Sequence, residues 1–337
     1  NYSRADIFLT NTGTPQIFPS VPGDNAFNPC FIGGANGTDC RAAENALRAS
    51  LGVPGALSTG FLLPVSPIFT IQGDRNNVDV TQEQYRGTLG VKGDLPFIDS
   101  SWTFEVAGTY SRSEGKSIRR GVREDKLAFA LGIDPTADFD GDGVIDNNGD
   151  GIADDYDQNV DFFGGNTPCD ASSLANPGAA LPDLTVGCVP VNLFAASVLG
   201  STIGDFSSQA ERDYLFGFRN FDTTYEQILI NGFVTGSLFS LPAGDVAAVV
   251  GVEYRKDKIN STPSVEASNG LLFGFFADRG AVGSKDLKEV YGELDIPLQA
   301  GKPWVEELTV NLAGRITDEE FYGTAGTYSI KAGWRPI

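Results

Sequence analysis

A dense run of aspartates lies near the middle of the chain. Residues 138–157 read DFDGDGVIDNNGDGIADDYD and include neither lysine nor arginine. Proteins bind Ca²⁺ through about six to eight oxygen atoms, and a twelve-residue loop supplies them from positions 1, 3, 5, 7, 9 and 12, with glycine at position 6. Bare carboxylates at this density would repel one another unless a cation neutralised them. The residue types and their spacing therefore predict a calcium-binding loop.

Two overlapping registers of such a loop fit the segment. The complete register begins at Asp146, and its ligands are Asp146, Asn148, Asp150, the Ile152 carbonyl, Asp154 and Asp157. The second register begins at Asp138, and its ligands are Asp138, Asp140, Asp142, the Val144 carbonyl and Asp146. It departs from the pattern at position 12, where Gly149 stands. The arrangement resembles the calcium loops of thrombospondin type-3 and dockerin repeats. We predict structural Ca²⁺ here; the alternative is a solvated acidic loop without metal.

The four cysteines form two pairs that are close in sequence. Cys30 and Cys40 make one pair and Cys169 and Cys188 the other, each within a segment rich in glycine, proline and asparagine. Free thiols in such segments would be exposed and reactive, so we predict the disulfides Cys30–Cys40 and Cys169–Cys188 and an oxidising compartment. Zinc is less well supported, because neither pair has C-x-x-C spacing.

Composition limits the functions that the chain can have. It contains 0 His, which removes histidine-based catalytic dyads and histidine-ligated metals, and no nucleophile or phosphate-binding motif occurs in a suitable context. The formal net charge of -20 disfavours nucleic acid, whose phosphates require a basic surface. We therefore expect neither an enzyme nor a nucleic-acid-binding protein. No apolar run approaches the roughly 18 residues of a transmembrane helix.

Several segments alternate strictly between apolar and other residues. In 308–317 the residues Leu308, Val310, Leu312 and Ile316 share one face, and Tyr328, Ile330, Ala332 and Trp334 do so in the last segment. A period of two predicts β-strands. The apolar face ends in aromatic residues, whereas the other face carries charges and amides, as in a transmembrane β-barrel. A water-soluble sandwich with one wet face gives the same alternation.

The connections between the predicted strands alternate in length. Those at 94–101, 241–245 and 297–303 are short, whereas those at 11–79, 112–222 and 256–285 are long. We therefore predict an antiparallel meander with long loops at one end only. We also predict an outer strand end at 1–10 and helices near 40–51 and 125–132.

Much of the chain resembles one family. GSKDLKEVYGELDIPLQAGKPWVEELTVNLAGRITDEEFYG, followed by TYSIKAGWRP, resembles the mid-barrel region of outer-membrane TonB-dependent receptors. AERDYLFGFRNFDTTYEQILINGFVTGSLFSLPAG and YRGTLGVKGDLP are similar to earlier parts of the same barrel. The resemblance covers most of Gln84–Ile337. Residues 1–80 resemble the family only in the general style of their sequence.

The resemblance implies an all-β fold in which an antiparallel meander forms part of a transmembrane barrel. Residues 80–123 and 223–337 would be barrel strands, and 11–79 and 124–222 long extracellular loops. It implies energised uptake of a siderophore, vitamin or oligosaccharide across the outer membrane of a Gram-negative bacterium. The partners would be membrane lipid, that ligand, and TonB, bound through an N-terminal region that, with the plug domain, is absent here. The alternative is a calcium-stabilised extracellular β-protein, such as an adhesin or a filament subunit.

Overall fold

One antiparallel sheet dominates the structure. The computed structural model describes residues 1–10, 16–34, 37–58, 62–72, 77–138 and 166–336. The sheet has eight strands in the order β1-β2-β3-β4-β5-β6-β7-β8, so each strand pairs with its neighbours in sequence, and the predicted antiparallel meander is confirmed. The strands are β1 (Tyr2–Leu9), β2 (Val78–Asp94), β3 (Thr103–Val122), β4 (Phe216–Leu241), β5 (Gly244–Pro263), β6 (Ala281–Lys302), β7 (Val305–Glu319) and β8 (Gly323–Arg335).

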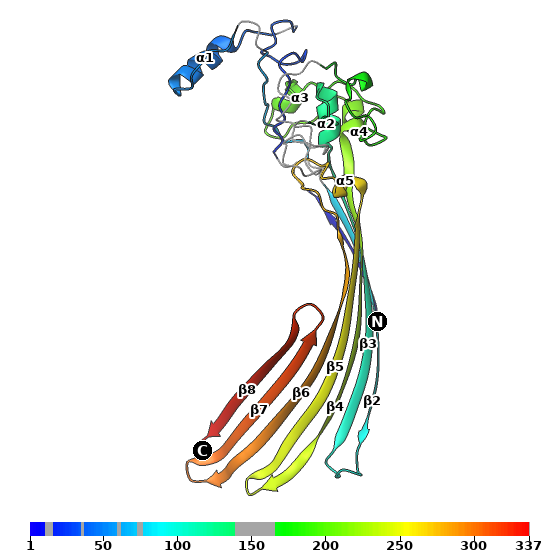
Figure 1. Cartoon of the computed structure of the whole chain (residues 1–337), viewed down its shortest axis with the longest axis vertical. Coiled ribbons are helices and arrows are strands. Elements are labelled where there is room, and N and C mark those ends of the chain that lie inside the picture. The colour runs from blue at the N-terminus through cyan, green and yellow to red at the C-terminus, as the bar shows by residue number, and fades with distance from the viewer. Residues whose placement is uncertain (11–15, 35–36, 59–61, 73–76, 139–165, 337) are drawn as a thin grey trace.

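The sheet is open. Within the described residues β1 pairs only with β2 and β8 only with β7, so the two outer strands keep one unpaired edge each. Figure 1 shows the sheet as a long, curved ribbon whose two outer strands do not meet. The meander is therefore present without the closure of a barrel.

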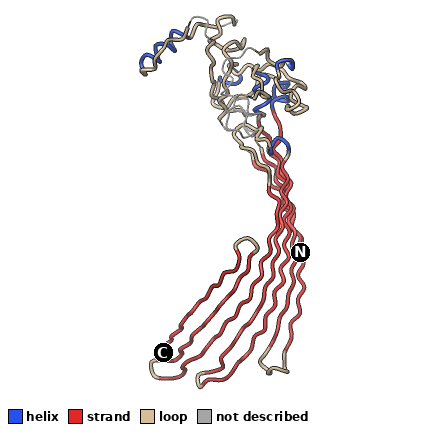
Figure 2. The backbone as a smooth tube through the Cα atoms, viewed as in Figure 1, coloured by secondary structure: helices blue, strands red, loops and turns tan. Residues whose placement is uncertain are grey.

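The long connections lie together at one end of the sheet (Figure 1), as the alternation of loop lengths predicts. At the opposite end the turns after β2, β4 and β6 are short. The turn after β4 is tight because Gly244 adopts a positive φ of 141°, a conformation that glycine takes without a steric cost. Figure 2 shows strands running from these turns almost to the long loops.

The helices are short and lie in the long connections. They are α1 (Arg41–Ser50), α2 (Glu124–Leu131), the 3₁₀ turn η2 (Ala171–Ser173), α3 (Ala196–Leu199), α4 (Gln209–Leu215) and α5 (Val265–Ser268). The helices predicted near 40–51 and 125–132 are confirmed as α1 and α2. Local sequence explains their ends: α2 stops at Gly132 in the left-handed conformation, and Ser208 and Glu211 form a capping box at the start of α4.

The three long connections fold together into a small domain, which we call the loop cap. It consists of residues 16–34 and 62–72 from the first connection, 123–138 and 166–215 from the second, and 264–280 from the third. Asn25 Nδ2 donates to the Leu131 carbonyl at 3.0 Å, and Phe18 meets Phe273 edge to face, so the connections contact one another. Its buried core includes Ile17, Val21, Phe69, Ile71, Leu127, Leu131, Ile133, Val191, Leu193, Val198, Phe206, Tyr214 and Leu215.

The strands β4, β5 and β6 extend further toward the loop cap than the sequence predicts, whereas β3 ends close to the predicted residue 123. β3 and β4 stay paired as far as Val122 and Phe216, and β5 and β6 reach Pro263 and Ala281. The expected loop 256–285 therefore shortens to 264–280, and the loop before β4 ends at residue 215 rather than 222. The start of β4 carries phenylalanines on both faces, Phe218 and Phe221, and the end of β5 is mainly polar, so neither segment shows the alternation on which the prediction relied.

A β-bulge changes the face of one aromatic residue. Strict alternation along β4 predicts that Phe239 lies on the polar face. The register of β4 on β5 shifts between Ser237 and Phe239, and Phe239 then pairs with Val246. Because an extra residue in one strand reverses the alternation beyond it, Phe239 shares the face of Val246.

Candidate functional site

One face of the sheet is apolar over the half that lies away from the loop cap. We call it the apolar face, and the strand registers place its members side by side. Many are exposed to solvent, including Leu89 at 80 % and Ile330 at 70 % exposure, whereas Ala248 is buried. Its members are Leu89, Val91, Phe104, Val106, Tyr110, Ile228, Ile230, Val234, Ala248, Val250, Val252, Tyr254, Val290, Leu294, Ile296, Leu308, Val310, Leu312, Ile316, Tyr328, Ile330, Ala332 and Trp334.

The apolar face has a sharp upper limit. Tyr85, Tyr110 and Tyr254 lie at its upper border, and Tyr110 Oη donates to Glu226 at 2.9 Å. Above them the same face carries charged residues, among them Glu83, Arg112, Glu114, Lys256, Lys258 and Asp286. Below them, Glu306 near the start of β7 is the one charged residue among the described strand positions on this face. The face therefore changes abruptly from apolar to charged at a row of tyrosines.

Tryptophans lie at the lower end of the apolar face. Trp102 Nε1 donates to the Ser237 carbonyl at 2.9 Å, and its ring covers Gly236. Trp334 Nε1 donates to the Trp304 carbonyl at 3.0 Å, while both of these rings stay exposed. An amphipathic ring with its N–H satisfied suits a boundary between an apolar and an aqueous medium.

The opposite face of the same strands is polar. Arg315 Nη1 contacts Glu289 at 2.8 Å, and Thr317 Oγ1 donates to the same carboxylate at 2.7 Å. Asp257 is only 8 % exposed and accepts hydrogen bonds from Tyr225 Oη and Gln227 Nε2 at 2.7 and 2.8 Å. Further polar members are Glu105, Thr109, Asn231, Thr235, Glu253, Arg255, Glu293, Asp295, Asn311, Ser329 and Lys331. We call this side the polar face.

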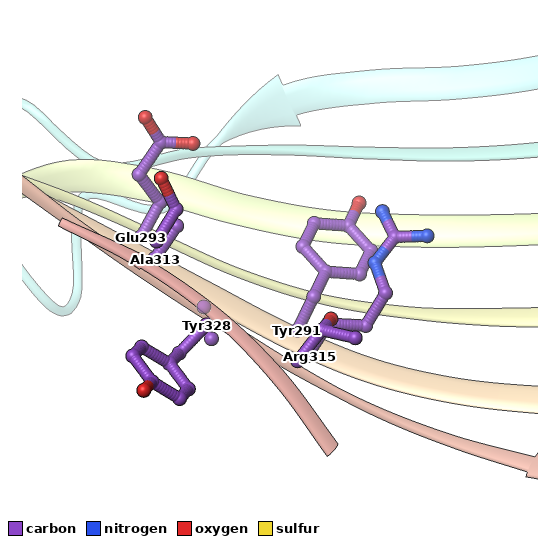
Figure 3. A pocket seen from close by; sticks show the side chains of 9 residues that line it. Tyr291, Glu293, Ala313, Arg315 and Tyr328 are labelled. Atoms are coloured by element: carbon purple, nitrogen blue, oxygen red, sulfur yellow. The ribbon is translucent and has the colours of Figure 1, made fainter. Parts of the chain in front are cut away.

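Figure 3 shows how the two faces separate around a hollow of about 220 Å³ at β6, β7 and β8. Tyr291, Glu293 and Arg315 extend to one side of the strands, and Tyr328 extends to the other. The Arg315 guanidinium lies 5.3 Å from the centre of the Tyr291 ring. The hollow thus presents a carboxylate, a guanidinium and a phenol on the polar face.

A buried ion-pair network holds the loop cap together. Arg123 is 1 % exposed, and its guanidinium donates to Asp125 at 2.7 Å and to Asp183 at 3.2 Å. Glu266 of α5 lies 3.8 Å away, and Lys126 Nζ contacts Asp183 at 2.8 Å. Burial by itself lowers the pKa of Arg123, but the aspartates outweigh it and raise that pKa above the ordinary value. One arginine therefore links the second and third connections.

Acid is expected to weaken the loop cap through Asp183. Burial raises the pKa of this carboxyl group, but Lys126 and Arg123 outweigh burial and hold it below its ordinary value of 3.8. A carboxylate with a lowered folded-state pKa stabilises the fold above the unfolded-state pKa, and this contribution disappears as the pH falls through the folded-state value.

Thermal unfolding measured between pH 6 and pH 2 tests this expectation. The midpoint temperature of unfolding should decrease once the pH is below about 4. The Asp183→Asn variant should have a lower midpoint temperature at pH 6, and acidification should lower it by less. Identical pH profiles for the two proteins would show that Asp183 does not contribute.

Both predicted disulfides are present. Cys30 bonds Cys40 in the first connection, and Cys169 bonds Cys188 in the second. The described residues include no free cysteine. In the chain-entropy model loops of 10 and 19 residues correspond to a stabilisation of about 3 kcal/mol each. Cys169 N also donates to the Phe129 carbonyl, so the second bond connects directly to α2.

The predicted calcium ligands lie outside the described residues, apart from Asp138. This applies to Asp140, Asp142, Val144, Asp146, Asn148, Asp150, Ile152, Asp154 and Asp157. Within the described part of the chain, no group of three or more His, Cys, Asp or Glu residues could hold a metal ion. The calcium loop therefore stays a prediction.

Sequence patterns did not indicate the buried network or the basic residues beside it. Arg119, Arg120 and Arg123 fall within one stretch of five residues, although the chain as a whole is strongly acidic. This local excess of positive charge is the signal that could have identified them. The structure places Arg119 and Arg120 on opposite faces of β3 and buries Arg123 in the loop cap.

No protein-family profile matches this chain, and no curated protein sequence matches it either. In the part of the chain that the structure describes, no helix is long and apolar enough to cross a membrane.

Proposed function

We propose that the chain forms part of the barrel wall and the extracellular loops of an outer-membrane TonB-dependent receptor, which takes up a scarce ligand. The observation that supports this function best is the continuous, exposed apolar face, bordered by tyrosines and tryptophans and backed by a polar face. Water-soluble proteins rarely expose apolar patches larger than a few hundred Å². Lipid covering this face explains the exposure of its side chains.

The dimensions of the apolar face suit a bilayer. In β4 the face runs from Ile228 to Leu238, about ten residue steps and roughly 33 Å along the strand. Strands of outer-membrane barrels tilt by about 35–45°, and their apolar band is about 25 Å tall. A strand of this length at such a tilt spans about the same height. The tyrosine and tryptophan borders then coincide with the two membrane interfaces.

The remaining parts have matching roles under this proposal. The polar face lines a lumen, and the loop cap captures the ligand outside the cell. The ligand is a siderophore, a vitamin or an oligosaccharide, and TonB supplies energy through a region beyond these residues. The disulfides suit an oxidising exterior. The unpaired edges of β1 and β8 are where further strands would join, because exposed strand edges pair readily with other strands.

Fractionation of cells that produce the protein tests the proposal. We expect the protein in the outer-membrane fraction, released by detergent but not by high salt or carbonate. A calcium-stabilised adhesin or filament subunit would instead dissolve in buffer without detergent. Recovery in the aqueous fraction would therefore exclude the receptor and favour this second class.

We propose that the segment 138–157 binds structural Ca²⁺ within an extracellular loop. Calorimetric titration with Ca²⁺ should show binding, and Asp150→Ala should weaken it by more than Asp155→Ala. The reason is that Asp150 occupies ligand position 5 of the complete register, whereas Asp155 falls at position 10, which is not a ligand position. Equal effects of the two substitutions, or no heat of binding, would leave the segment as an ordinary acidic loop.

A further inference from the structure

Two arginines face each other directly across neighbouring strands near the loop cap. Arg119 of β3 pairs with Arg219 of β4, and both lie on the polar face because the register between these strands is continuous. Like charges directly opposite each other in a sheet are destabilising. Such an arrangement is unexpected in a chain of net charge -20, which makes the pair a candidate for binding a negative charge.

Aromatic rings hold both guanidinium groups in place. Phe275, from the connection between β5 and β6, lies 5.1 Å from the Arg119 guanidinium and 5.2 Å from that of Arg219. Phe221 lies 4.5 Å from the Arg219 guanidinium. These cation–π contacts fix the position of both positive groups without neutralising them.

The negative charge within reach does not balance the pair. Asp278 contacts Arg219 Nη2 at 3.2 Å, and its side chain is 46 % exposed. The buried Arg219 Nε has no hydrogen-bond acceptor, and no carboxylate in the described residues forms an ion pair with Arg119. Burial, followed by the charge of Arg219, lowers the pKa of Arg119. One positive charge and several N–H donors therefore remain available.

We propose that Arg119 and Arg219 bind an oxyanion, a carboxylate or a phosphate, beside Phe275. Guanidinium groups bind both anions through paired, charge-assisted hydrogen bonds. The site lies where the loop cap meets the polar face, because Arg119 is three residues from the end of β3 and Phe275 belongs to the cap. That this oxyanion belongs to the transported ligand rests on the proposed function, whereas the binding itself does not.

Calorimetric titration of the intact protein in detergent tests the site. Inorganic phosphate and citrate are the two probes, and sodium chloride at equal ionic strength is the blank. We expect at least one probe to bind, and Arg119→Gln and Arg219→Gln each to weaken it by roughly tenfold to a hundredfold. Lys116→Gln is the matched control, because Lys116 is an exposed cation on the opposite face of β3.

The outcomes separate this site from the proposed function. No binding of either probe, or equal weakening by Arg119→Gln and Lys116→Gln, would overturn the site. Arg219→Gln also removes the contact with Asp278 and could prevent folding. In that case, the comparison of Arg119→Gln with Lys116→Gln tests the site. Oxyanion binding by a protein that fractionates without membranes would uphold the site and reject the receptor. Membrane insertion without oxyanion binding would reject the site and uphold the receptor.

Discussion

Arg123→Met is expected to destabilise the loop cap by about 3–5 kcal/mol, because it leaves a buried carboxylate without its partner. The Asp125 side chain is 5 % exposed, and its two oxygens accept from the Arg123 guanidinium. Methionine fills much of the same volume but cannot donate hydrogen bonds. The substitution affects the Asp183 carboxylate less, because its side chain is 51 % exposed and still forms an ion pair with Lys126.

Hydrogen exchange of backbone amides in α2 measures this loss directly. Arg279→Met is the matched control, because Arg279 is an exposed arginine in the third connection, and it should change exchange very little. The double variant Arg123→Met with Asp125→Leu should recover part of the loss, since replacing both members of a buried pair costs less than removing one. Equal protection in Arg123→Met and Arg279→Met would contradict this account of the cap.

The half of the sheet that lies away from the loop cap could be predicted from the sequence because its two faces carry different kinds of residue. Between β4 and β8, alternate residues such as Val250 and Val252 are apolar, and glycine or proline marks each short turn. Period two then gives the strands, and the turn lengths give the meander. The β-bulge before Phe239 was not predictable from alternation, because one extra residue reverses the pattern without changing the composition.

The loop cap could not be predicted in the same way. Ile17, Phe69 and Leu127 belong to one core, but they come from distant segments without a shared period. Contacts between loops depend on three-dimensional proximity that no local window of sequence contains. Cysteine pairing was the exception, because Cys169 and Cys188 are close enough in sequence for proximity to favour one connectivity.

Buried charge was the other feature that sequence patterns did not indicate. Arg123 is followed by Glu124, Asp125 and Lys126, and such a run of charged residues is typical of a solvated surface. The structure instead buries Arg123, Asp125 and Lys126 beneath the connections. Likewise, the facing arrangement of Arg119 and Arg219 depends on the strand register, and their sequence separation gives no indication of it.

Neighbouring valines in β5 provide a second large expected effect. Val250 lies on the apolar face opposite Val234, and Val249 lies on the polar face opposite Thr235 and Glu293. Arginine at the midplane of the lipid-facing side of an outer-membrane barrel costs about 2–4 kcal/mol, whereas substitutions in the lumen are tolerated far better. Val250→Arg should therefore destabilise the inserted protein by about this amount, and Val249→Arg by much less.

Denaturant unfolding of the intact protein in phospholipid bilayers, compared for these two variants, tests most directly which face meets lipid. We predict that Val250→Arg lowers the free energy of unfolding by about 2–4 kcal/mol and that Val249→Arg, with the same residue change one position away, lowers it by less than about 1 kcal/mol. Equal losses, or a larger loss for Val249→Arg, would contradict the assignment of the apolar face to the membrane.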